Sequence, residues 1–169
     1  MGEQVFTSNL VSIKVLQQEK EIIPREINSD NVFIKCIVPK TKVRLEEEIL
    51  VTFRLYTKFG VDSIVRFIPL KFENFTSKFT IIPVHEGNQA MQLEHYNEDN
   101  YYAIDVCKIR ICPIRGGIFT MPLLSLILDL QFPSGVETLF GEEMKTVWKT
   151  IVSDADTIEV VAPSPLGLI

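Results

Sequence analysis

Two histidine–glutamate pairs flank a predicted turn, and they are the residues best suited to hold a metal ion. His85-Glu86 comes directly before Gly87-Asn88, and Glu94-His95 follows on the next predicted strand. Imidazole nitrogens and carboxylate oxygens are ordinary zinc ligands, and a hairpin closed at Gly87-Asn88 would bring the pairs together. Neighbours on a strand point to opposite faces, however, so each face receives at most one His and one Glu. We therefore predict no metal site and no bound cofactor.

Serine and cysteine side chains could supply a nucleophile, but the sequence around them is not that of a catalytic site. Ser125 and Ser134 do not lie in a Gly-x-Ser-x-Gly elbow, and no glycine-rich loop precedes a helix. Cys36, Cys107 and Cys112 form no Cys-x-x-Cys pair. We interpret all three as small buried hydrophobic residues. The chain is accordingly predicted not to be an enzyme and to have no catalytic residues.

A disulfide between the two nearest cysteines is excluded by their spacing. Cys107 and Cys112 lie five residues apart on one predicted strand, which separates them by about 16 Å. Whether Cys36 pairs with Cys107 or with Cys112 stays open.

Charge and hydropathy exclude two further classes of protein. The net charge is −5, and the 17 Lys and Arg residues are scattered, so no basic patch for nucleic acid is present. The longest apolar stretch, "MPLLSLILDLQF", is well short of the roughly 20 residues that span a bilayer. The first residues, "MGEQVFTSNL", carry no export signal. We expect either a cytosolic protein or a fragment with no membrane span of its own.

Apolar residues recur at every second position, which is the period of a β-strand. In residues 49–56 one face collects large apolar side chains, namely Ile49, Val51, Phe53 and Leu55. Similar runs lie at 6–16, 32–39, 77–84, 89–96, 101–114, 117–122, 124–132 and 156–163. Glycine, asparagine and proline punctuate them, and no long helical period occurs. The pattern predicts an all-β fold, an antiparallel sandwich.

The segment "CPIRGGIFTMPLL" (112–124) interrupts the most apolar part of the chain. Pro113 cannot donate to a strand ladder, so we expect the long strand to end there. Gly116-Gly117 supplies the positive φ that reverses the chain. A short strand then runs to Pro122. We interpret the segment as a corner of the sandwich.

At this corner the sequence resembles the "P-x-x-x-G-x-[FY]-T-[IM]-P" signature of the BatD family, the oxygen tolerance proteins of the Bacteroides aerotolerance operons. Residues 33–57 are similar to the family's domain opening, with Glu47 or Glu48 at its acidic position. Residues 93–106 are similar to a family hairpin whose turn is usually Asn-Gly. Because Asn97-Glu98 stands here instead, we expect a longer turn based on type I. The likeness extends over about residues 32–165.

The resemblance implies a domain organisation and a location. Residues 1–16 would be the last strand of a preceding similar domain and 17–31 a linker; 32–163 would form an immunoglobulin-like β-sandwich, and 164–169 would begin the next linker. Full-length family members carry a signal peptide and C-terminal membrane helices. The fragment would therefore lie in the periplasm, at the extracytoplasmic face of the inner membrane, in a membrane-anchored parent.

Two functions follow as expectations. The first is a non-enzymatic interaction domain that binds other Bat-type components, which the resemblance implies to be proteins with von Willebrand factor A and TPR domains. The second is a glycan-binding sandwich, whose aromatic platform would be Tyr96, Tyr101, Tyr102 and Trp148. In addition, Asp62-Ser63-Ile64 and Asp156-Thr157-Ile158 resemble a glycosylation pattern of exported proteins, with Ser63 and Thr157 as acceptors. Ordinary strand-boundary residues are the reading we favour there.

The stretch "PSGVETLFGEEMKTVWK" (133–149) is the least sheet-like part of the sequence, and we predict a long irregular loop. It holds five apolar residues that would form a partner-binding patch if exposed, namely Val136, Leu139, Phe140, Met144 and Trp148. The alternative is that Leu139 and Phe140 fold back and cap one end of the sandwich.

Overall fold

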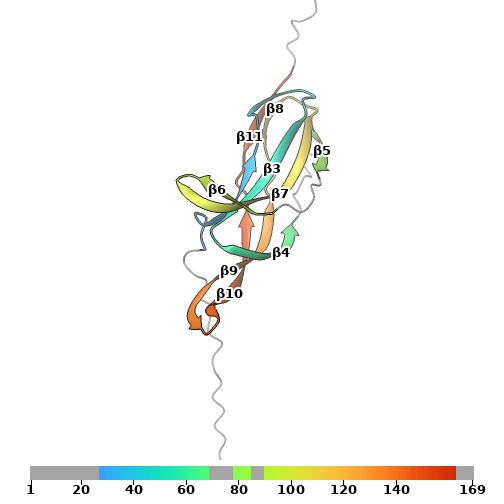
Figure 1. Ribbon diagram of the computed structural model, residues 1–169. Coiled ribbons are helices and arrows are strands. Elements are labelled where there is room, and N and C mark those ends of the chain that lie inside the picture. The colour runs from blue at the N-terminus through green and yellow to red at the C-terminus, as the bar shows by residue number, and fades with distance from the viewer. Residues whose placement is uncertain (1–26, 69–77, 85–89, 163–169) are drawn as a thin grey trace, which may run out of the picture.

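The computed structural model describes residues 27–68, 78–84 and 90–162, and these residues are all-β (Figure 1). The strands are β1 (Val32–Ile37), β2 (Lys42–Arg44), β3 (Ile49–Thr57), β4 (Gly60–Ile68), β5 (Phe79–Val84), β6 (Gln92–Tyr96), β7 (Asp99–Pro113), β8 (Gly117–Thr120), β9 (Ser125–Thr138), β10 (Gly141–Val152) and β11 (Thr157–Val161). The strand expected at 6–16 and the linker at 164–169 lie outside the described residues.

The first sheet has the order β1-β3-β7-β5, and β6 pairs with the start of β7. All of its pairs are antiparallel. The predicted inward face of β3 is confirmed, since Val51, Phe53 and Leu55 are fully buried. The alternation of β3 thus sets which side of the sheet faces the core.

The second layer consists of two three-stranded sheets, β10-β9-β4 and β2-β11-β8. Both are built on one pair of chain segments, 117–138 and 141–161, which is interrupted midway. At the interruption Leu124 N donates to Ser153 Oγ (2.9 Å) and Ser153 N donates to Leu124 O (2.8 Å). These bonds keep the segments side by side where the ladder stops.

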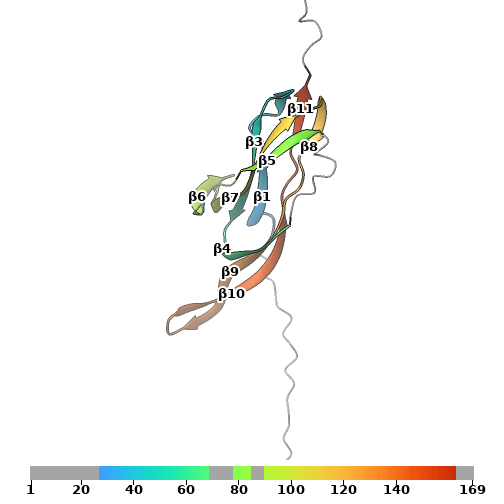
Figure 2. The ribbon, with the colours of Figure 1, turned by 90° about the vertical axis from the view of Figure 1, so that its right-hand side faces the viewer.

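The two layers can be followed in Figure 2. One hydrophobic core joins them into a sandwich-like fold. From the first layer it receives Phe53 and Leu55, and from the second it receives Leu126, Leu128 and Leu130 of β9. All five side chains are fully buried. Burial of this apolar surface is the main stabilising term of such a fold.

One strand pair differs from the antiparallel expectation. Strand β2 pairs with β11 in parallel, with Val43 opposite Val160. The chain leaves the first sheet after β1 and joins the edge of the second layer, where it runs in the direction of β11. Residues 32–44 therefore contribute to both layers, with β1 in the first sheet and β2 in the second layer.

The predicted corner is confirmed. Strand β7 ends at Pro113, β8 begins at Gly117, and Gly117 has a φ of 140°. The positive φ falls on Gly117 rather than on both glycines. Only glycine adopts this backbone conformation without strain.

We expect Gly117→Val to lower the free energy of unfolding by about 1–3 kcal/mol. A Cβ on Gly117 would stand 3.2 Å from the Phe119 ring, in addition to the backbone strain. The melting temperature measures the effect. Gly116→Ala, whose Cβ would make only ordinary contacts, is the control. Equal melting temperatures for both variants would contradict the corner.

The turn between β6 and β7 differs from the expected one. Tyr96 pairs directly with Asp99, so the turn has two residues, and Asn97 and Glu98 have φ values of 47° and 70°. Two positive φ values are typical of type I′, whose twist matches that of the flanking strands. The expectation of a longer type I-based turn is wrong because strand twist outweighs the unfavourable φ of Glu98.

Strand β4 was not predicted. Its pairing with β9 shifts register between Val61 and Ser63 and again between Ile64 and Arg66. Bulges of this kind break the alternation of apolar and polar residues on which the prediction depends.

Candidate functional site

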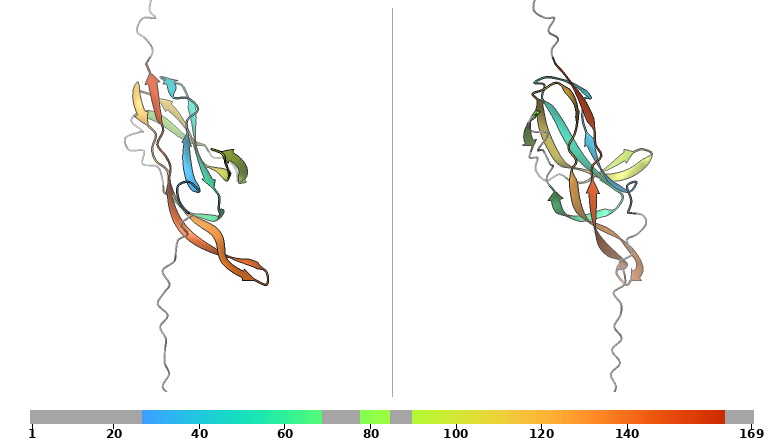
Figure 3. Two further views of the ribbon diagram at one scale, coloured as in Figure 1. Left: turned by 90° about the vertical axis from the view of Figure 1, so that its left-hand side faces the viewer. Right: turned by 180° about the vertical axis from the view of Figure 1, so that it is seen from behind.

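A projecting hairpin occupies the place of the expected irregular loop. Strands β9 and β10 continue to Thr138 and Gly141, and their distal parts, which we call the arm (residues 133–144), extend away from the body (Figure 3). The predicted loop is therefore wrong. The prediction failed because Pro133-Ser134-Gly135, which is typical of a strand end, lies inside β9.

A bulge accommodates these turn residues within the strand. Met144 is opposite Pro133 and Glu142 is opposite Glu137, so β9 has more residues between the two pairs than β10. Gly135 takes a φ of 77°, and its N–H donates to Glu142 Oε1 at 3.2 Å. A left-handed glycine in a strand is typical of a bulge, which bends and twists the hairpin.

The tip of the arm presents two apolar side chains to solvent. The turn is Thr138-Leu139-Phe140-Gly141, in which Phe140 N donates to Thr138 Oγ1 (3.2 Å) and Gly141 has a φ of 114°. Leu139 is 99% exposed and Phe140 is 100% exposed. The alternative that they cap the sandwich is therefore wrong. Hydrogen bonds order the backbone of this turn, which holds the exposed side chains of Leu139 and Phe140 outward.

The five predicted partner-binding residues are all exposed, but they do not form one patch. Leu139 and Phe140 are at the tip, and Val136 and Met144, each 51% exposed, lie along the arm. Trp148 lies nearer the body, next to Val147 in the core. Their role in binding a partner stays a prediction.

Acidic side chains precede and follow the apolar tip along the arm. Glu137, Glu142 and Glu143 are exposed on the arm. Glu142 and Glu143 also bond to Gly135 N and Ser134 Oγ. The arm thus combines an apolar end with a negatively charged stem.

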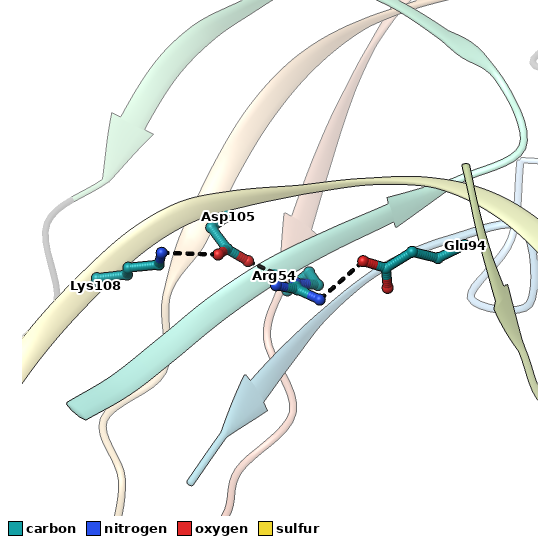
Figure 4. A network of polar contacts seen from close by, with 4 residues as sticks. All are labelled: Arg54, Glu94, Asp105 and Lys108. Atoms are coloured by element: carbon teal, nitrogen blue, oxygen red, sulfur yellow. Dashed lines mark hydrogen bonds and ion pairs between the residues drawn. The ribbon is translucent and has the colours of Figure 1, made fainter. Parts of the chain in front are cut away.

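A second polar feature lies on the outer side of the first sheet, where Arg54 of β3 bridges two carboxylates (Figure 4). Arg54 Nε donates to Asp105 Oδ1 at 2.5 Å and Nη1 donates to Glu94 Oε1 at 2.9 Å. Lys108 Nζ lies 3.0 Å from Asp105 Oδ2. Asp105 is only 9% exposed. Burial raises the pKa of Asp105, but hydrogen bonds from Arg54 and Lys108 outweigh it, and the pKa lies below its usual value.

A bulge brings this network together. Phe53 pairs with Cys107 and Arg54 with Asp105, so Val106 is an extra residue on β7. The bulge places Arg54 directly opposite Asp105. The sequence offered no signal for this contact, because its partners lie 40 and 51 residues from Arg54. Each charged side chain of the network has a partner of opposite charge. We therefore infer that the network holds the β6–β7 hairpin against β3.

The four aromatic residues expected to form a glycan platform are not brought together. Tyr96 and Tyr101 pack with Phe33 and Tyr56, and the Tyr101 hydroxyl donates to Asp30 O at 2.7 Å. Tyr102 lies on the first sheet and Trp148 on the second. The predicted platform is therefore wrong, because Tyr96 and Tyr101 pack against other aromatic rings.

The cysteines are free thiols, so the open question of a disulfide is answered. Cys36 is buried as expected, whereas Cys107 and Cys112 are only partly buried. Cys36 and Cys107 both pair with Phe53, from opposite sides, so two strand spacings, about 9.5 Å, separate them. Burial raises the pKa of the Cys36 thiol to about 12 and also raises that of Cys107. Both are weak nucleophiles at neutral pH.

We expect Cys36 to react with a thiol reagent at pH 8 only after unfolding, because its thiol is buried and protonated. Mass spectrometry of the protein labelled with iodoacetamide, with and without denaturant, measures this. Labelling of Cys36 at equal rates in both conditions would contradict its burial.

The residues considered for a metal site are only partly described. His85 and Glu86 lie outside the described residues. His95 Nδ1 is 3.1 Å from Asn100 Oδ1. Within 27–68, 78–84 and 90–162 no three His, Cys, Asp or Glu side chains form a metal-binding group. The same ranges contain no helix that is long and apolar enough to cross a membrane.

Comparison with models of protein families, with curated proteins and with solved structures found no match to this chain.

Proposed function

We propose that this chain is a non-enzymatic interaction domain with an immunoglobulin-like fold. The strand order supports the fold. The order β1-β3-β7-β5 corresponds to A-B-E-D of an immunoglobulin sheet, and β4-β9-β10 corresponds to C-F-G. Strand β6 is an addition, and β2 crosses to the second layer. The correspondence is one of strand order alone.

The single observation that carries the function is the arm. A monomeric domain gains nothing in stability from Leu139 and Phe140, which contact solvent on all sides. Large apolar groups at the centre of a contact are typical hot spots of protein interfaces. A hydrogen-bonded hairpin that presents them suits insertion into an apolar pocket of a partner protein.

The family resemblance supplies the identity of the partner in this proposal. The chain would be a piece of a BatD-like aerotolerance protein, placed in the periplasm by a membrane-anchored parent. Its partners would be the Bat-type components with von Willebrand factor A and TPR domains. The signature at Pro113–Pro122, whose corner contains Gly117, is the part of the chain that supports this resemblance most directly.

Substitution at the tip tests the proposal. We expect Leu139→Asp with Phe140→Asp to abolish capture of purified Bat-type partner domains by the immobilised chain. The melting temperature should stay unchanged, because neither side chain is packed in the free protein.

The matched control is Ile118→Asp with Leu123→Asp, which places the same charges on side chains that are 75% and 51% exposed away from the arm. It should leave capture intact. Equal capture by the tip variant and the parent chain would contradict a binding role of the arm.

A further inference from the structure

The outward face of the sheet β10-β9-β4 carries an exposed indole beside a carboxylate. Trp148 is 68% exposed, and its cross-strand partner is Asp129 of β9. Directly opposite residues share a face, with Cβ atoms about 4.5–5.5 Å apart. The neighbours Val147, Leu128 and Leu130 point into the core, so Trp148 and Asp129 point outward.

The Asp129 carboxylate is not satisfied within the described structure. Its Oδ1 is buried and has no hydrogen-bond partner among the described residues, although the residue as a whole is partly exposed. A buried acceptor without a donor reduces stability. The terminal torsion of aspartate is soft and two-fold, so rotation exchanges the two oxygens at the surface. Whichever oxygen is exposed at the surface can accept a hydrogen bond from a ligand hydroxyl.

Neutral hydrogen-bonding groups lie beside this pair. Thr146 and Thr150 are exposed two residues before and after Trp148, on the same side of β10. Gln131, next to Asp129 on its face of β9, donates through Nε2 to Asp62 Oδ1 at 3.1 Å, which leaves its amide oxygen as an acceptor. The face therefore offers one aromatic plane, the Asp129 carboxylate and several neutral polar groups, while the Asp62 carboxylate is bonded to Gln131.

We propose that this face binds a hexopyranose unit of a neutral glycan. The apolar C–H face of the sugar lies on the Trp148 indole, and a ring hydroxyl donates to the exposed oxygen of the Asp129 carboxylate. Thr146 and Thr150 bond to hydroxyls of adjacent sugar units along β10. The site is separate from the tip of the arm and goes beyond the proposed protein-binding function.

Two other ligands suit the face less well. An amine or guanidinium would contact Trp148 and Asp129, but it would leave the flanking hydroxyl and amide groups unused. A metal ion needs more ligands than Asp129 provides, and the described residues contain no metal-binding group of three. A polyhydroxylated ligand uses all of these groups.

Trp148 is the only tryptophan of the chain, so its fluorescence reports on the site directly. The full chain is titrated with neutral oligosaccharides of glucose, mannose, galactose and N-acetylglucosamine. We expect a saturable change with at least one of them. Calorimetry with that sugar should show loss of binding in Trp148→Ala and about tenfold weaker binding in Asp129→Asn.

Two further variants separate a binding role from a structural one. Asp129→Leu should abolish sugar binding and raise the melting temperature, since it removes an unpaired carboxylate. Phe140→Asp should leave sugar binding unchanged. The proposal is overturned if no sugar of the panel gives a saturable change, if Asp129→Leu binds the sugar normally, or if agmatine binds in place of the sugars and is displaced by salt.

Discussion

Arg54→Met is expected to lower the free energy of unfolding by about 2–3 kcal/mol. Removing one partner of a buried ion pair costs about 3–5 kcal/mol, because the other charge stays desolvated. The expected loss is smaller here because Arg54 is 30% exposed and Lys108 continues to neutralise Asp105. Methionine keeps most of the apolar stem, so the loss reports the charge. Urea unfolding followed by circular dichroism measures it.

A double-mutant cycle shows whether the loss comes from the pair. Arg54→Met with Asp105→Leu should be more stable than Arg54→Met alone, since the second change removes the buried carboxylate that has lost its hydrogen bond from Arg54. The exposed Arg115→Met is the control for loss of a cation and should cost less than about 0.5 kcal/mol. A double variant that is no more stable than Arg54→Met would contradict the assignment of Asp105 as the stranded charge.

Leu128→Ala is expected to have the larger effect on stability, a loss of about 3 kcal/mol. Leu128 is fully buried in the core between the two layers. Leucine-to-alanine changes in cores cost about 2–5 kcal/mol, which combines the lost transfer energy and the cavity left behind. The midpoint and slope of urea unfolding measure the loss.

The arm provides a matched control with the same chemical change. Leu139→Ala removes the same atoms from a side chain that is 99% exposed, so the free energy of unfolding should change by less than about 0.5 kcal/mol. If Leu128→Ala and Leu139→Ala lowered the free energy of unfolding by similar amounts, the burial of Leu128 and the exposure of Leu139 would both be contradicted.

Most of the strands were predictable from the sequence because their signals are local. Alternation in 49–56 identified β3 and its buried face, and Pro113 with Gly117 identified the corner. These features follow from the period of two in a strand and from the backbone limits of proline and glycine. Both operate within a few residues, so neighbours in the chain suffice to reveal them.

The same local rules failed where a bulge places turn residues inside a strand. Pro133-Ser134-Gly135 predicts a strand end, and two register shifts hide the alternation of β4. A bulge is stabilised by its partner strand, through contacts such as Gly135 N to Glu142 Oε1. The residues of one strand alone do not show it.

The order of the amino acids is enough to predict an all-β chain, the inward face of its central strand and a set of apolar residues at 136–148. The folded structure shows where these side chains are exposed: Leu139 and Phe140 at the tip of the arm, and Trp148 beside Asp129, whose buried Oδ1 lacks a donor. It also decided that Arg54 meets Asp105, 51 residues away. Exposure and pairing depend on which distant segments pack against a residue, and only the folded arrangement of the strands specifies that.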